Sequence, residues 1–159
     1  MERLTQTHED NCWQTCVAML LGCPPAFLPD QHVLGGGLEY VHPLRAYLHE
    51  HTAMTYAEVG SERFADIARQ GTPHLMMGET VRTSPEHDVW HAIVGISGVA
   101  YWDVHPSRAG LTKVFKFGFL APIPAEWKLE WDRRKKAGDA KAFCVCPSCA
   151  VAARKVSVA

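Results

Sequence analysis

Residues 12–21 read CWQTCVAMLL, an almost continuous apolar run and the strongest structural signal in the chain. Asp10 and Asn11 precede it and are good N-cap residues, and Gly22 follows it in the place of a C-cap. These signals predict a buried helix that begins at or just before the first residue of the run. Tandem prolines and three tandem glycines make residues 23–37 a predicted loop.

Outward from this helix, the pattern predicts helices first and strands afterwards. Further helices are predicted at residues 43–51, 61–70 and 124–137. Pro43 would occupy a first helical position, and Ser61 would cap its helix. Strand-like runs, separated by turn residues, occupy residues 53–58, 74–78, 89–96, 100–104 and 111–119. This order predicts an α+β domain with a small antiparallel sheet over residues 1–137, followed by a tail at 138–159.

The composition is that of an ordinary globular protein. The chain has 159 residues, a typical size for one domain, and can bury a core without disulfides or metal. The formal net charge of −1 gives no reason to expect a nucleic-acid or membrane-surface partner. No run approaches the roughly 18 apolar residues of a membrane span. The expected partner is therefore neither nucleic acid nor membrane.

The six cysteines form two clusters, one near each end of the chain, at positions 12, 16, 23, 144, 146 and 149. This is not the even spread of a disulfide framework, and residues 1–9 lack the apolar region of a secretory signal. The cysteines therefore predict a reducing, cytoplasmic compartment, either of a cell or of a host into which the protein is delivered.

Cys12 is the cysteine best placed for chemistry. A cysteine attacks a carbonyl carbon only as the thiolate, and its free pKa of about 8.5 leaves little thiolate at neutral pH. A helix N-terminus favours an anion, because backbone N–H groups and the helix dipole point at it. Cys12 lies at the predicted helix start, whereas Cys16 and Cys23 lie inside or after the helix. Cys12 is thus the candidate nucleophile, and the other two are interpreted as structural.

His91 is the candidate base for Cys12. It lies inside VWHAIVGI, an otherwise apolar strand, where an imidazole costs free energy unless it is hydrogen-bonded. Asp103 follows 12 residues later, past a turn at Gly98, so adjacent antiparallel strands would place its carboxylate beside the imidazole. The carboxylate would fix the tautomer and stabilise the imidazolium, as the acid of a catalytic triad does. The backbone N–H of Cys12 and the side chain of Gln6 are the candidate oxyanion donors.

These residues resemble the papain-like cysteine peptidases, in which a glutamine six residues before a Cys-Trp pair supplies the oxyanion hole. QTHEDNCWQTCVAM, residues 6–19, is most similar to the compact C39-like peptidases and the AvrRpt2-type bacterial effector proteases. Three later segments also resemble these families. GTPHLMM is similar to their strand before the histidine, WHAIVGI to their histidine strand, and YWDVHP to the segment that carries their acid. The resemblance covers about residues 6–119. It implies a papain-like fold, with the nucleophile helix packed on an antiparallel sheet, and thiol peptidase or related acyl-transfer chemistry.

The chain departs from that family in three places. The His–Asp gap of 12 residues is short, so the hairpin between these two residues must be tight. The Cys–His gap is 91 − 12 = 79 residues, which is shorter than in papain. Val104 and His105 also separate the acid from the following proline, where the family has Asp-Pro.

Three further side chains are candidate substrate contacts. Trp13 follows the nucleophile, Trp90 precedes the base, and His87 lies in the loop before it. His105 is a rival imidazole, interpreted as facing solvent or substrate.

Each catalytic assignment has a structural alternative. Cys12 could be a core thiol, since free cysteine is among the most buried residue types. His91 could be a hydrogen-bonded core histidine, Asp103 a turn cap, and Gln6 an ordinary polar residue of the terminus.

The tail carries its own cysteine cluster. Cys144, Cys146 and Cys149 supply three thiolates, whereas a structural zinc site needs four ligands. The fourth ligand would come from Cys23, a histidine or another chain. The alternatives to a metal site are free thiols or a disordered end. The predicted chemistry itself requires no cofactor.

The expected function is a cysteine peptidase or isopeptidase acting on a peptide or protein substrate. The same triad would also serve an acyltransferase or a deamidase. A third reading is a papain-fold binding module that uses its cysteine-bearing tail and whose Cys12 is inert.

Overall fold

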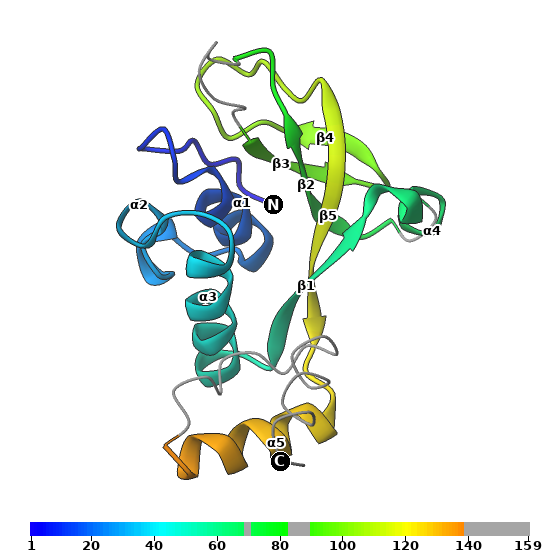
Figure 1. Ribbon diagram of the computed structural model, residues 1–159. Coiled ribbons are helices and arrows are strands. Elements are labelled where there is room, and N and C mark those ends of the chain that lie inside the picture. The colour runs from blue at the N-terminus through cyan, green and yellow to red at the C-terminus, as the bar shows by residue number, and fades with distance from the viewer. Residues whose placement is uncertain (69–70, 83–89, 139–159) are drawn as a thin grey trace, which may run out of the picture.

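The computed structural model describes residues 1–68, 71–82 and 90–138 (Figure 1). Its helices are α1 (Cys12–Leu21), η1 (Pro25–Phe27), α2 (Gln31–Leu34), α3 (Leu38–His51), η2 (Ser61–Arg63), α4 (Phe64–Ala68) and α5 (Ala125–Lys136). Its strands are β1 (Met54–Gly60), β2 (Pro73–Glu79), β3 (Trp90–Ile96), β4 (Val99–Trp102) and β5 (Lys113–Pro122). Every predicted strand is present, with its ends moved by a few residues.

The strands of the described residues form one antiparallel sheet in the order β1-β5-β2-β3-β4. The long strand β5 pairs with both β1 and β2, so it joins the first strand to the rest of the sheet. The predicted α+β class and the small antiparallel sheet are confirmed.

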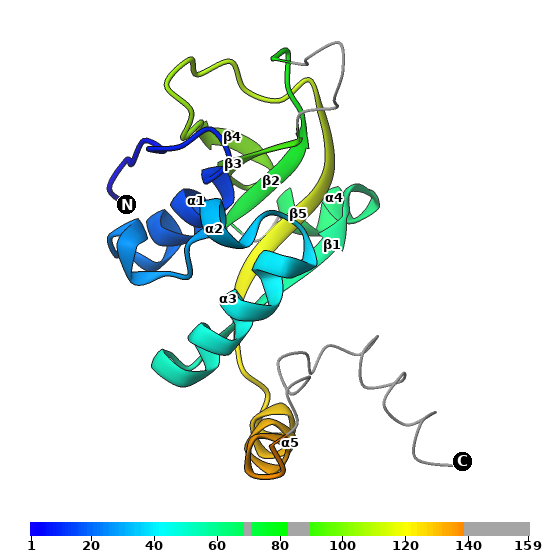
Figure 2. The same cartoon turned by 60° about the vertical axis from the view of Figure 1, so that its left-hand side comes forward.

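Helices α1, α2 and α3 lie on one side of the sheet (Figures 1 and 2). α1 packs against β2 and β3, and α3 packs against β1. The core between them includes Val17 of α1, Leu44 and Leu48 of α3, and Leu75 and Val94 of the sheet, all fully buried. The helix that carries the candidate nucleophile is therefore held against β3, the strand that carries the candidate base.

A smaller cluster covers the other face of the sheet. Met76, Ile93 and Phe117 form it, and the ring of Phe64 from α4 lies 6.0 Å from that of Phe117. Met76 and Ile93 follow core residues of β2 and β3, and successive strand residues point to opposite faces. The sheet is thus covered on both sides at its centre.

A tight hairpin joins β3 to β4. Its two loop residues, Ser97 and Gly98, have φ values of 53° and 76°, the pattern of a type I′ turn. Ile96 then pairs with Val99, so the chain turns back at once. This hairpin brings the residue after β4, Asp103, back toward the start of β3.

Helix α3 begins earlier than predicted, at Leu38, and Pro43 lies inside it rather than at its first position. Tyr40, Val41 and Leu44 are buried at the spacing of one helical face. Burial of this face outweighs the hydrogen bond that proline removes.

Two other boundaries also differ from the prediction. Residues 23–37 are not a plain loop, because they contain η1 and the short helix α2, which Asp30 caps through the N–H of His32 at 2.9 Å. Ser61 begins the 3₁₀ turn η2 instead of capping a long helix, and α4 follows it as far as Ala68. Residues 69–70 lie outside the described residues.

Helix α5 begins after Pro124, as predicted, and lies against the far end of α3. Trp131 is buried with its ring 5.0 Å from that of His49, and Lys135 forms an ion pair with Glu50.

Among the described residues, no helix combines the length and the apolar character needed to cross a bilayer.

Candidate active site

Cys12 is the first residue of α1, as the sequence predicts. Asn11 occupies the N-cap position, but its side chain does not cap the helix. Instead, its Oδ1 accepts a hydrogen bond from the N–H of His8 at 3.2 Å, and its amide donates to Thr7 at 3.1 Å. The side chain of Asn11 therefore shapes the turn before α1 and caps none of the first N–H groups of the helix.

The Cys12 thiol is buried, with 7% of the residue exposed. Burial raises the pKa of this thiol, while the N–H groups of Ala92 and Trp13 and the charge of Arg82 oppose the rise. The thiol is therefore protonated at neutral pH, and a base must take its proton before it can attack.

Cys16 lies one turn further along α1 and is fully buried. Its Sγ is 3.4 Å from the carbonyl oxygen of Ala92, and burial raises the pKa of its thiol well above the usual value. Both cysteines thus meet the same residue of β3, directly after His91. Cys16 anchors the helix, in agreement with its structural interpretation.

His91 and Asp103 form a buried pair. Nε2 of His91 lies 2.6 Å from Oδ1 of Asp103, and the two residues are 3% and 8% exposed. Because Nε2 meets the carboxylate, Nδ1 is the ring nitrogen left for another partner. The predicted contact between these two side chains is confirmed.

Asp103 is held by several donors. Its Oδ1 also accepts from the N–H of His105 at 2.8 Å, and its Oδ2 accepts from the N–H of Gly110 at 2.8 Å. Burial alone would raise the pKa of Asp103, but the hydrogen bonds from His91, His105 and Gly110 outweigh it and lower this pKa to about 2. The carboxylate is thus ionised at neutral pH and can stabilise an imidazolium.

His105, the other candidate imidazole, lies beside the ring of His91. Its ring lies 6.0 Å from that of His91 and its Nδ1 lies 2.8 Å from the hydroxyl of Ser107. His105 does not line the cavity described next.

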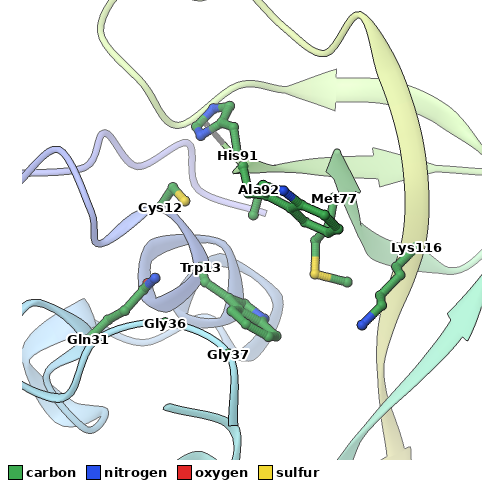
Figure 3. Close-up of a pocket in the computed structure, with 10 residues that line it drawn as sticks. Cys12, Trp13, Gln31, Gly36, Gly37, Met77, His91, Ala92 and Lys116 are labelled. Atoms are coloured by element: carbon green, nitrogen blue, oxygen red, sulfur yellow. The ribbon is translucent and has the colours of Figure 1, made fainter. Parts of the chain in front are cut away.

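Cys12 and His91 line one cavity of about 320 Å³ between α1 and the sheet (Figure 3). Among the described residues, no hydrogen bond joins Cys12 Sγ to the His91 ring. Catalytic hydrogen bonds are often long in the absence of substrate and tighten on binding. Cys12 and His91 therefore line the same cavity but are not hydrogen-bonded to each other in the absence of substrate.

Gln6 does not have the free amide that the sequence predicts for an oxyanion donor. Its Nε2 donates to the carbonyls of His8 at 2.7 Å and Glu9 at 3.0 Å, which uses both amide hydrogens. Its backbone N–H donates to the carbonyl of Val104 at 2.8 Å. In this arrangement Gln6 holds the turn before α1 and ties it to the residue after Asp103.

Two of the three predicted substrate contacts line the cavity. Trp13 forms one wall and donates through Nε1 to the hydroxyl of Tyr56 at 2.9 Å. Trp90 is 56% exposed at the cavity and lies 5.0 Å from the ring of Phe115. His87 lies outside the described residues.

Sequence reasoning missed the other lining residues, which are Gln31, Gly36, Gly37, Met77, Ala92 and Lys116. Met77 and Lys116 face each other across β2 and β5, so the register of the sheet brings them together. The tandem glycines are a local signal for a turn in this segment, since Gly35 and Gly37 have positive φ values. No sequence pattern indicates Gln31, because it lies in α2, a short helix within the segment that is predicted to be a loop.

Among the described residues, no group of three or more His, Cys, Asp or Glu side chains could hold a metal ion. The tail cysteines Cys144, Cys146 and Cys149, for which a zinc site is one of the alternatives, lie outside the described residues.

Comparisons with protein-family models, with curated proteins and with solved structures found no match for this chain. The site is therefore interpreted from its own geometry.

Proposed function

We propose that this protein is a cysteine peptidase or isopeptidase of papain-like type. The observation that carries the proposal is the buried His91–Asp103 pair, whose histidine lines one cavity together with the Cys12 thiol at the start of α1. A histidine that is held by a carboxylate and lies near a helix-start cysteine is the arrangement that thiol acyl-transfer chemistry needs.

The proposed reaction starts with the neutral thiol. His91 takes the Cys12 proton, and the sulfur adds to the carbonyl carbon of a peptide or isopeptide bond. The carbonyl oxygen becomes an oxyanion near the backbone N–H of Cys12 at the start of α1. Asp103 stabilises the imidazolium, which then gives its proton to the leaving amine.

The second half of the reaction frees the enzyme. After the amine leaves, the acyl group remains on Cys12 as a thioester. Water loses a proton to His91 and attacks this thioester, which returns Cys12 to the thiol and releases the acid. The apolar walls of the cavity, Trp13, Met77 and Trp90, favour a substrate with an apolar side chain beside the scissile bond.

A peptide library with mass-spectrometric readout tests the proposal. Wild-type protein should cleave a subset of peptides, and Cys12→Ala should abolish cleavage of all of them without lowering the melting temperature by more than a few degrees. Cleavage that persists in Cys12→Ala would refute the proposed nucleophile.

A further inference from the structure

Gln31 is fixed against the first turn of α1 by two reciprocal hydrogen bonds. The N–H of Gln14 donates to Oε1 of Gln31 at 2.9 Å, and the N–H of Gln31 donates to Oε1 of Gln14 at 3.1 Å. Nε2 of Gln14 donates in turn to the carbonyl of Pro25 at 2.9 Å. Each amide therefore has a defined orientation, because each Oε1 meets a backbone donor.

This orientation leaves the NH₂ group of Gln31 for the cavity. Gln31 is 6% exposed and lines the cavity together with Cys12. Figure 3 shows its amide nitrogen directed toward Cys12. Among the described residues, Nε2 of Gln31 has no hydrogen-bond partner, although Oε1 and the backbone N–H both have one. A side-chain donor that faces the cavity and has no protein partner within the described residues is available to a ligand atom.

Gln6, the other candidate oxyanion donor, is already occupied, since it donates both of its amide hydrogens to backbone carbonyls. We propose that Nε2 of Gln31, together with the backbone N–H of Cys12, forms the oxyanion hole. This inference rests on the proposed function, because it assigns a donor to the same reaction.

In the step concerned, the Cys12 sulfur forms a bond to the carbonyl carbon and the C=O π electrons move to oxygen. Gln31 donates a hydrogen bond to that oxygen without transferring a proton. When the C–N bond breaks, the electrons return from oxygen to carbon and the contact weakens. Removal of one such donor typically costs about 100- to 1,000-fold in kcat.

Two reagents that react with the Cys12 sulfur distinguish an oxyanion donor from a residue that affects Cys12 in another way. A dipeptide aldehyde with apolar side chains forms a hemithioacetal, whose oxygen lies where the oxyanion would lie. Iodoacetamide alkylates the same sulfur without forming any oxyanion. An oxyanion donor therefore affects aldehyde affinity but not the limiting alkylation rate at high pH.

The key variant is Gln31→Glu, which keeps an acceptor for the Gln14 N–H and removes the NH₂ donor. Aldehyde affinity should fall about 10- to 100-fold, while the limiting alkylation rate should stay within about threefold of wild type. Gln31→Met, a neutral variant, should give the same pattern and excludes an effect of the added charge.

The matched comparison is Gln6→Met, measured with the same two probes. If Gln6→Met loses aldehyde affinity and both Gln31 variants keep it, Gln6 is the donor and the inference is overturned. Failure of the proposed function has a different signature: wild-type protein would then bind no aldehyde at any concentration tested, and both claims would fall.

Discussion

At the scale of single residues, the site contains two pairs of side chains. His91 and Asp103 are hydrogen-bonded in the absence of substrate, whereas Cys12 and His91 are not. His91 is bound to Asp103 at 2.6 Å, whereas the Cys12 thiol is buried and has a raised pKa. The uncharged resting thiol removes the cost of burying an isolated thiolate. The carboxylate is already ionised, so in the proposed mechanism it would stabilise the imidazolium that forms when His91 takes the Cys12 proton.

The pKa of Asp103 makes a prediction about stability. A carboxyl group with a folded pKa of about 2 and an unfolded pKa of about 3.9 stabilises the folded state above pH 4. The stabilisation is lost as the pH falls through the folded pKa. Asp103→Asn should therefore lower the free energy of unfolding by about 2 kcal/mol at pH 7, and the difference should shrink below about pH 4.

Urea denaturation at several pH values measures this difference. Asp66→Asn is the matched control, because Asp66 pairs with Arg63 on the surface and should change stability by less than about 0.5 kcal/mol. An equal loss of stability in Asp103→Asn at pH 7 and pH 3 would refute the ionised, hydrogen-bonded carboxylate.

At the scale of elements, the docking of α1 on β3 places the site. Cys12 and Cys16, one turn apart, both meet Ala92, and His91 is the preceding residue. The β3–β4 hairpin then brings Asp103 to the other side of the imidazole. Two local features, a helix spacing and a two-residue turn, thus assemble three side chains from distant parts of the chain.

A bulge between Met77 and Gly78 shapes β2 opposite His91. A Cβ at Gly78 would lie 1.7 Å from the carbonyl oxygen of Lys113, a backbone atom that cannot move aside. Gly78→Ala should therefore destabilise the protein by about 1–3 kcal/mol and slow reactions at the neighbouring site.

Thermal and urea unfolding measure the effect, with Gly36→Ala as control. A Cβ at Gly36 would meet no atom within 4 Å, although Gly36 lines the same cavity. Equal stability of the two variants would contradict the close approach of β2 and β5 at Gly78.

At the scale of the whole molecule, α5 packs against the end of α3 through Trp131 and His49, and it contributes no residue to the lining of the cavity. Trp131→Ala should lower the free energy of unfolding by about 3 kcal/mol, because a buried aromatic side chain is lost. Alkylation of Cys12 should be unchanged, since α5 does not line the cavity.

Leu129→Ala on the same helix is the matched control, because Leu129 is 71% exposed and its loss should cost less than about 0.5 kcal/mol. Slower alkylation of Cys12 in Trp131→Ala, at a temperature where the variant is folded, would show that α5 supports the site.

Across these scales, the sequence predicted what depends on local signals. The start of α1, the strands, and the placement of Cys12, His91 and Asp103 at these elements follow from apolar runs and turn residues, although the Asn11 side chain does not cap α1. The place of Gln31 depends on how residues 23–37 fold back on α1, which no local pattern encodes. The start of α3 was misplaced because tertiary burial of Tyr40 overrides the usual preference of proline for a first helical turn.

The most direct test of the central claim is the alkylation rate of each cysteine by iodoacetamide at about pH 7, mapped by peptide mass spectrometry. Cys12 should react faster than the more exposed Cys23, and His91→Gln should slow Cys12 at least about tenfold without changing Cys23. If Cys12 reacts no faster than Cys23, or reacts equally fast in His91→Gln, then Cys12 and His91 do not form a thiol–imidazole pair.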